Sequence, residues 1–120
     1  MTTKKILICD DDPGILEMLE LLLEETGHQI IAEANSLNVR SIIERESPNL
    51  MVLDLWMPVL SGDQVLKMVR ENPLTKELPV IVISASTDGK QIADKAGATN
   101  FLAKPFDVDE LISMVESYLA

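Results

Sequence analysis

The feature that most constrains the fold is an alternation of two hydrophobic periods along the chain. Short apolar runs rich in Ile, Val and Leu recur at residues 6–9, 29–32, 50–53, 80–83 and 101–103. Unbroken apolar runs of this length are typical of strands covered on both faces, and therefore of a parallel sheet. The run at 29–32 is more polar than the others, so we expect it to form an edge strand.

Between these runs the apolar residues follow the period of an amphipathic helix. In the first such segment Met18 and Leu19 lie on the apolar face, and Gly27 is expected to end the helix as a C-cap. The second helix is expected to start at Ser36 or Asn38. The methionines of the chain are expected in the core.

The remaining helices have clear start and stop signals. The third must end before Pro73, which cannot continue a helix. The fourth, at residues 87–96, has Ile92 as its only large apolar residue. We weigh two interpretations of it equally: a short half-exposed helix, or a loosely anchored element that moves in a switch. Asp107 is expected to cap the fifth helix, and Asp12, just before Pro13, to cap the first.

Strand and helix alternate five times, which predicts a doubly wound α/β fold with right-handed crossovers. We find no linker, repeat or low-complexity segment, so residues 1–120 are expected to form a single domain. The length is sufficient for a hydrophobic core without disulfide bonds.

Composition excludes several classes of function. A formal net charge of -10 argues against direct binding of nucleic acid, whose phosphates need clustered Lys and Arg. No apolar run approaches the length of a membrane span, and the N-terminus does not resemble a signal peptide. The single cysteine, Cys9, lies in an apolar run and is expected to be a buried, inert thiol. A cytoplasmic location is therefore expected.

Polar side chains follow four of the five predicted strands. Asp10 and Asp11 follow the first, and Asp54, Ser84 and Lys104 follow the third, fourth and fifth. In a parallel sheet these positions share the carboxyl edge, where open α/β sheets bind ligands. Three carboxylates, a hydroxyl and an ammonium group are therefore expected in one cleft.

Three neighbouring carboxylates repel one another unless some are protonated or a cation binds between them. Oxygen ligands without His or a reactive Cys favour Mg²⁺ over zinc. Such an ion, together with Lys104 and Ser84, would neutralise a phosphoryl group in transit. One carboxylate would then be the nucleophile that forms an aspartyl phosphate.

Four fragments in order resemble the receiver domains of bacterial two-component response regulators, in particular the chemotaxis regulators. They are residues 6–13 (ILICDDDP), residues 53–58 (LDLWMP) with Gly62, the pair Ser84-Ala85 and the pair Lys104-Pro105. The resemblance covers essentially the whole chain. It implies a five-stranded parallel sheet of flavodoxin-like order 2-1-3-4-5 with helices on both faces.

The resemblance also implies a role for each matching residue. Asp54 corresponds to the phosphoryl acceptor, Ser84 and Lys104 to the residues that contact the phosphoryl group, and Phe101 to the aromatic residue that switches with Ser84. The metal ligands would be Asp10, Asp11, Asp54 and the main-chain carbonyl of Trp56. The Lys104-Pro105 bond corresponds to one that is often cis. Ser84 has a second interpretation, as a cap of the following loop, and both can hold.

By the same resemblance, the function is that of a switch in a two-component phosphorelay. A sensor histidine kinase or a histidine phosphotransfer protein would donate the phosphoryl group, with Mg²⁺ as cofactor. The surface near the fourth and fifth helices and the fifth strand would change shape for an unknown output partner. A dimer linked to phosphorylation is compatible with this function, and so is either a stand-alone receiver or a piece of a longer regulator or hybrid kinase.

Three alternatives belong to other classes. A haloacid-dehalogenase-type phosphatase would need an acid two residues after the nucleophile, where this chain has Trp56, so we expect no turnover enzyme. A flavodoxin-like flavin module would be opposed by the repulsion between Asp10–Asp12 and a phosphate. A degenerate receiver that binds partners without phosphorylation conflicts with the complete set of matching residues.

Overall fold

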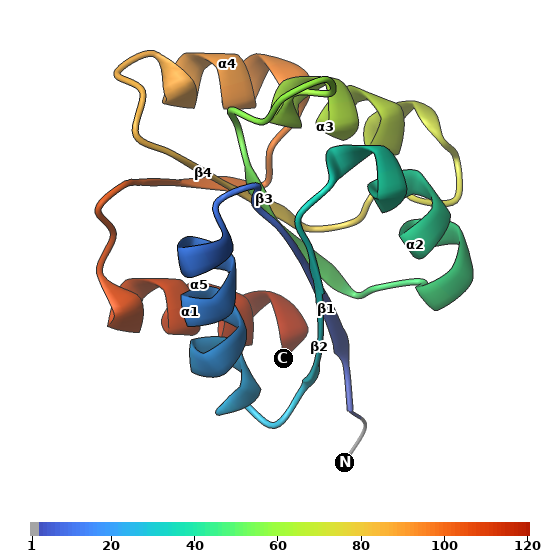
Figure 1. The fold of residues 1–120 in the computed structure, drawn as a ribbon. Coiled ribbons are helices and arrows are strands. Elements are labelled where there is room, and N and C mark those ends of the chain that lie inside the picture. The colour runs from blue at the N-terminus through green and yellow to red at the C-terminus, as the bar shows by residue number, and fades with distance from the viewer. Residues whose placement is uncertain (1–2) are drawn as a thin grey trace.

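The computed structural model describes residues 3–120 and contains one sheet of parallel strands (Figure 1). The strands are β1 (Lys5–Cys9), β2 (Gln29–Glu33), β3 (Leu50–Asp54), β4 (Val80–Ser84) and β5 (Asn100–Ala103). Their order in the sheet is β2-β1-β3-β4-β5. The doubly wound fold predicted from the hydrophobic pattern is therefore confirmed, as is the edge position of β2.

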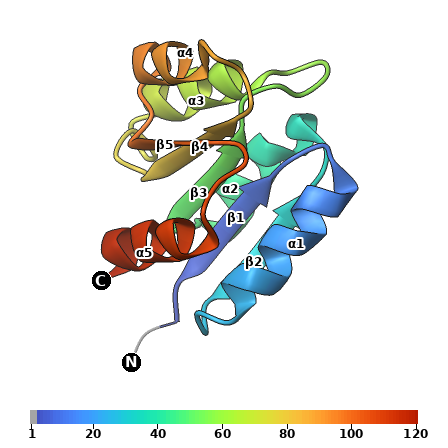
Figure 2. The same cartoon turned by 90° about the vertical axis from the view of Figure 1, so that its left-hand side faces the viewer.

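The helices cover both faces of the sheet. They are α1 (Pro13–Glu24), α2 (Val39–Glu46), α3 (Gly62–Glu71), α4 (Gly89–Ala96) and α5 (Val108–Leu119), with a 3-10 turn, η1 (Ser36–Asn38), before α2. Figure 2 shows α1 and α5 together on one face, while α2, α3 and α4 lie on the other. This arrangement explains why the central strands β1, β3 and β4 are almost continuously apolar: both of their faces are buried.

Alternate residues of each strand contribute to two separate hydrophobic cores. Leu7 and Leu53 belong to the core beneath α2, α3 and α4, whereas Ile8 and Val52 belong to the core beneath α1 and α5. The strands pair in register, so that Cys9 lies beside Leu53, and Leu53 beside Val82. The carboxyl ends of the strands are therefore level with one another, which places the residues that follow them at one edge.

The helix caps are largely those that the sequence predicts. The side chain of Asp12 accepts hydrogen bonds from the N–H groups of Gly14 and Ile15, and Asp107 accepts from those of Asp109 and Glu110. The third helix ends at Glu71, before Pro73. Each acidic cap also lies where the positive end of a helix dipole favours negative charge.

One expected helix boundary is wrong, and one is confirmed with a different capping side chain. Gly27 has the left-handed φ of +84° but does not cap α1, which ends at Glu24. A further turn follows, in which the N–H of Gly27 donates to the carbonyl of Glu24 at 3.1 Å. Before α2, the capping side chain is that of Asn35, which accepts from the N–H of Leu37 and starts η1 instead of the α-helix. Asn38 occupies the N-cap position of α2, as expected, but its side chain makes no capping bond.

Two further expectations need correction. The fourth helix begins at Gly89, because residues 85–88 form a turn after β4. Met18 is not a core residue: its side chain is 40% exposed, whereas Met51 is fully buried. Met18 instead lines an apolar hollow beside Lys104, although the next residue, Leu19, is fully buried. Within residues 3–120, none of the helices has the length and hydrophobicity needed to cross a bilayer.

Candidate functional site

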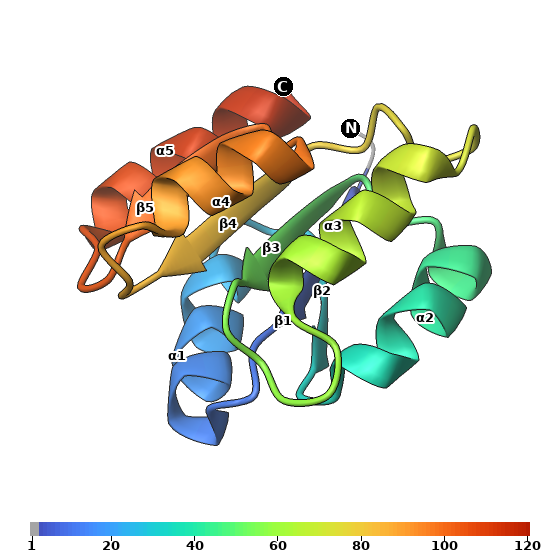
Figure 3. The ribbon, with the colours of Figure 1, turned by 90° about the horizontal axis from the view of Figure 1, so that it is seen from above.

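The polar residues that follow the strands meet at the carboxyl edge of the sheet. Asp10 follows β1, Asp54 ends β3, Ser84 ends β4 and Lys104 follows β5. The N–H of Lys104 donates to the carbonyl of Ser84 at 2.9 Å, which continues the pairing of β4 and β5 by one residue. Figure 3 shows the loop that leaves the end of β3 at this edge and returns to the start of α3.

Three carboxylates form the centre of the site. Asp10, Asp11 and Asp54 each have an oxygen atom such that these atoms all lie within 4.8 Å of one another. Asp10 is 1% exposed and Asp54 is 6% exposed, whereas Asp11 faces solvent. The cluster therefore has two buried members, held by the sheet, and one member that reaches it from the surface.

Lys104 reaches into this cluster from β5. Its ammonium nitrogen lies 3.1 Å from Oδ1 of Asp54 and 3.2 Å from Oδ2 of Asp10. Among residues 3–120, no hydrogen bond ends on the other oxygen of Asp54. One oxygen of Asp54 is thus held by a cation, and the second is left without a protein donor.

The charges of the cluster are not balanced by Lys104 alone. Burial, followed by the negative charge of Asp10, raises the pKa of Asp54 from 3.8 to about 6, and the hydrogen bond from Lys104 offsets this only in part. Burial lowers the pKa of Lys104, but its hydrogen bond to Asp54 and the charge of Asp10 outweigh that effect and raise it. Lys104 is therefore charged at neutral pH, and the cluster retains a net negative charge that favours a further cation.

A second contact fixes the orientation of Asp10. Its Oδ1 accepts a hydrogen bond of 3.0 Å from the N–H of Asp12, while its Oδ2 faces Lys104. Asp12 thus has two functions in the loop: its main chain orients Asp10 and its side chain caps α1. The sequence predicts only the second of these.

Behind the carboxylates lie two sulfur atoms. The thiol of Cys9 donates to the thioether of Met57 at 3.5 Å, and both side chains are buried. Burial, with the charge of Glu33 and then of Asp10, raises the pKa of the Cys9 thiol to about 12. Cys9 is therefore a protonated thiol and not a metal ligand or nucleophile, as the sequence predicts.

The hydroxyl of Ser84 is directed to the loop after β4. Its Oγ accepts a hydrogen bond of 3.0 Å from the N–H of Ser86. The interpretation of Ser84 as a cap of this loop is therefore confirmed. Phe101 is half-buried and packs against the core beneath α2, α3 and α4. The Lys104-Pro105 bond is cis, in agreement with the expectation.

Two exposed apolar residues lie in the β3–α3 loop at the rim of the site. Trp56 is 51% exposed and Val59 is 81% exposed. Val59 has a φ of +70°, a left-handed conformation that is unfavourable for a β-branched residue. Nothing in the sequence pattern indicates this conformation.

Gly62 closes the same loop against Asp54. Its N–H donates to the carbonyl of Leu55 at 2.7 Å, and a Cβ at this position would lie 2.3 Å from the carbonyl oxygen of Asp54. Only glycine fits here. The sequence identifies Gly62 as part of a motif, and the structure supplies the physical reason.

The donor set suits a hard divalent cation. The three carboxylates supply oxygen atoms only, and the neighbouring thiol is protonated. Among residues 3–120, no hydrogen bond ends on the main-chain carbonyl of Trp56, which leaves that oxygen available as a further ligand. Asp10, Asp11 and Asp54 are therefore a fitting set for Mg²⁺, and the Trp56 carbonyl stays a predicted further ligand.

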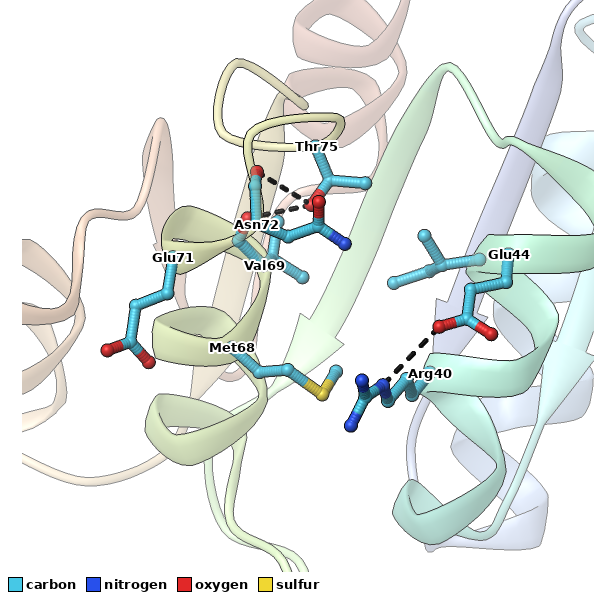
Figure 4. A pocket seen from close by; sticks show the side chains of 8 residues that line it. Arg40, Glu44, Met68, Val69, Glu71, Asn72 and Thr75 are labelled. Carbon is cyan, nitrogen blue, oxygen red and sulfur yellow. Dashed lines mark hydrogen bonds and ion pairs between the residues drawn. The ribbon is translucent and has the colours of Figure 1, made fainter.

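Several hollows lie outside the cluster, of which two are near elements that matter here. An apolar one of about 400 Å³ borders Lys104 and is lined by Ile15, Met18, Ala85, Pro105, Phe106 and Val108. Another, of about 350 Å³, lies between α2 and α3 (Figure 4). Arg40 and Glu44 form an exposed ion pair across its rim, with Nε and Oε1 3.4 Å apart. This second hollow contains none of the predicted site residues, so it is not the candidate site.

Comparison with known proteins identifies the family. The model of the response regulator receiver domain matches residues 6–116. The chain belongs to the receiver domain family of response regulators. Receiver domains are signalling switches of two-component systems that accept phosphoryl groups from sensor histidine kinases, and they bind Mg²⁺ at an acidic pocket.

Individual relatives agree with this assignment. The receiver domain is 36% identical over 121 residues to sporulation initiation phosphotransferase F of Bacillus subtilis, covering 99% of this chain and 96% of that protein. It is 31% identical to the phosphate regulon transcriptional regulatory protein PhoB of Pseudomonas aeruginosa, where the match covers 99% of this chain and 53% of the regulator.

The solved structures agree as well. The crystal structure of a putative response regulator from Chloroflexus aurantiacus matches the receiver domain with a TM-score of 0.93 and 33% identity over 98% of both chains. The resemblance found in the sequence motifs is therefore confirmed at the level of family and fold.

Proposed function

We propose that this receiver domain accepts a phosphoryl group on Asp54 in an Mg²⁺-dependent reaction. The observation that supports the proposal best is the environment of Asp54. It is buried beside Asp10, has one oxygen held by Lys104 and has the other without a protein donor. A carboxylate in this setting is positioned by one oxygen and free to attack with the other.

The chemistry follows from these contacts. The unpaired oxygen of Asp54 attacks the phosphorus atom of a phosphohistidine; a P–O bond forms, the P–N bond breaks, and the imidazole retains the electron pair and takes up a proton. Lys104, which contacts Asp54 at 3.1 Å, would pair with an oxygen of the transferred group as negative charge develops there. With a pKa of about 6, Asp54 is mainly ionised at neutral pH and so able to act as the nucleophile.

The proposed ligands of Mg²⁺ are Asp10, Asp11, Asp54 and the Trp56 carbonyl. When bound, the ion would neutralise the carboxylates and the incoming phosphoryl oxygens. Asp10 is pre-oriented by the N–H of Asp12.

Ser84 and Phe101 are the proposed switch residues. Turning of the Ser84 hydroxyl from the Ser86 N–H toward the phosphoryl group would alter the surface near α4, α5 and β5.

The proposed donor is a sensor histidine kinase or a histidine phosphotransfer protein. A donor must approach Asp54 over the carboxyl edge, where the apolar hollow beside Lys104 and the exposed Met18 offer contact surface. Residues 1–120 are proposed to act as one domain in the cytoplasm, as a switch that catalyses its own phosphorylation and dephosphorylation. The net charge of -10 makes direct nucleic acid binding unfavourable.

The deciding experiment is incubation with acetyl phosphate and Mg²⁺, followed by measurement of the intact mass. We expect a gain of one phosphoryl group in the wild type, and none in Asp54→Asn or without Mg²⁺. An unchanged wild-type mass, or a full gain in Asp54→Asn, would refute the assignment. A steady-state assay with p-nitrophenyl phosphate separates the switch from a phosphatase, since the switch should show no turnover.

A further inference from the structure

Helix α4 begins against the end of β4, with no room for a side chain at its first residue. Its buried positions are Gly89, Ala93 and Ala96, all of them small residues. Because small side chains keep a helix backbone near its packing partner, the first turn of α4 lies directly on the end of β4. Gly89 is buried at this contact, and its φ is in the range that other residues adopt.

The contact of Gly89 has no room for a side chain. A Cβ added there would lie 2.9 Å from the Cβ of Ser84, 2.9 Å from its Oγ and 3.3 Å from Cε1 of Phe101. The first two distances are shorter than ordinary van der Waals contacts allow. A side chain at residue 89 would therefore meet both of the proposed switch residues at once.

The hydroxyl of Ser84 occupies the space that this glycine leaves free. Its Oγ accepts from the N–H of Ser86 at 3.0 Å, and among residues 3–120 it makes no hydrogen bond to Asp54 or Lys104. The Cβ of Ser84 cannot move away, since β4 is buried and paired on both sides. The hydroxyl, by contrast, can rotate about the Cα–Cβ bond.

We propose that Gly89 is a positioning residue of the switch, because its missing side chain leaves the space in which the Ser84 hydroxyl rests before Asp54 is phosphorylated. The inference rests on the proposed roles of Asp54 and Ser84. A methyl group at residue 89 would meet the Cβ of Ser84 in either rotamer, but it would meet Oγ only in the resting one, so it destabilises the resting rotamer relative to the rotamer turned toward Asp54. Gly89 thereby keeps the unphosphorylated conformation populated and transmits the rotation of Ser84 to α4.

The effect has a direction and an approximate size. The free energy needed to crowd one side-chain rotamer is enough to shift the equilibrium between the resting and the phosphorylated conformations about threefold to tenfold. The added Cβ at residue 89 would lie further from Phe101 than from Ser84, and the ring of Phe101 can move aside by rotation. Ser84 is therefore the residue that the added methyl group affects most. Gly89→Ala should therefore favour the phosphorylated conformation.

The test measures the affinity for beryllofluoride, a mimic of an acyl phosphate, in the presence of Mg²⁺. Trp56, the only tryptophan, supplies the fluorescence signal at the rim of the site. We expect Gly89→Ala to bind about threefold to tenfold more tightly than the wild type. The matched control is Gly14→Ala, whose Cβ has 3.4 Å to its nearest neighbour, and its affinity should stay within about twofold.

A second pair of variants distinguishes an effect of the Ser84 hydroxyl on the affinity from an effect of a general displacement of α4. Ser84→Ala keeps the Cβ that crowds residue 89 but removes Oγ. In that background Gly89→Ala should change the affinity by less than about twofold. An equal gain with and without the hydroxyl would refute the proposal, and so would an unchanged or weaker affinity of Gly89→Ala alone.

Should Gly89→Ala not fold, the wild type itself answers the question. The amide resonance of Gly89 should shift when beryllofluoride and Mg²⁺ bind, and shift much less in Ser84→Ala; an unmoved resonance would overturn the proposal. Failure of the proposed function looks different: no variant would bind beryllofluoride, and acetyl phosphate would add no mass.

Discussion

The ammonium nitrogen of Lys104 lies 3.1 Å from Oδ1 of Asp54, and yet the pKa of Asp54 is raised to about 6. Burial of the carboxyl and the charge of Asp10 together outweigh the attraction of the lysine. The metal-free site is thus under electrostatic strain, which a bound cation would relieve. This relationship has consequences for stability as well as for chemistry.

Asp54→Asn should stabilise the metal-free protein at neutral pH. The pKa of Asp54 is 3.8 in the reference state and about 6 in the folded state, so the folded state binds the proton more tightly. The wild type therefore loses stability as the pH rises from about 4 to 6, whereas Asp54→Asn does not. In EDTA we expect the free energy of unfolding of Asp54→Asn to exceed that of the wild type by about 2–3 kcal/mol at pH 7.5. The difference should vanish near pH 4. Urea unfolding at both pH values measures it, and a gain independent of pH would contradict the account.

Asp11→Asn should weaken Mg²⁺ binding by about tenfold or more, because it removes an oxygen ligand and its charge from the cluster. Asp12→Asn is the matched control: it removes one charge at the next residue but keeps a side chain able to cap α1. Its affinity should change by less than about threefold. Titration with Mg²⁺, monitored by Trp56 fluorescence, measures both. Equal weakening by the two variants would mean that only general charge matters.

Val59→Asn should raise the free energy of unfolding by about 0.5–1 kcal/mol. Val59 has a φ of +70° and is 81% exposed, so asparagine relieves backbone strain without loss of core packing. Leu74→Asn, at a residue 92% exposed with no such φ, should change stability by less than about 0.5 kcal/mol. Urea unfolding of the three proteins compares them, and an equal effect of the two substitutions would argue against strain at Val59.

Gly62→Ala should destabilise the fold by about 2–4 kcal/mol, since the new Cβ would meet the carbonyl oxygen of Asp54 at 2.3 Å and force the β3–α3 loop away from β3. Gly14→Ala makes the same chemical change in a helix where there is room, and should be neutral or slightly stabilising. Thermal unfolding of both variants is sufficient to check this. Tolerance of alanine at residue 62 would show that the loop is not held by this contact.

The parts of the structure that the sequence predicts are those controlled by hydrophobic period and strand ends. Asp10, Asp54 and Lys104 meet because parallel strands in register bring their carboxyl ends together. That result needs only the order and length of the apolar runs. The roles assigned to these residues came from the family resemblance and stay predictions.

Other features depend on close approach between segments distant in sequence, which no local pattern contains. The lack of room for a side chain at Gly89 exists because α4 lies close to the sheet, and the left-handed Val59 exists because the loop must close at Gly62. The exposure of Met18 has a similar origin, since periodicity cannot tell that its side chain borders a hollow formed with Pro105 and Phe106.

The buried thiol of Cys9 allows local opening of the structure beside the acidic cluster to be measured by alkylation. With a pKa of about 12 and no exposure, this sulfur cannot react with a maleimide or iodoacetamide unless β1 and the segment around Met57 separate. Because Cys9 is the only cysteine of the chain, its rate of alkylation counts these openings without labels or substitutions. A ligand that binds the carboxylates above it would slow the alkylation in proportion to its occupancy.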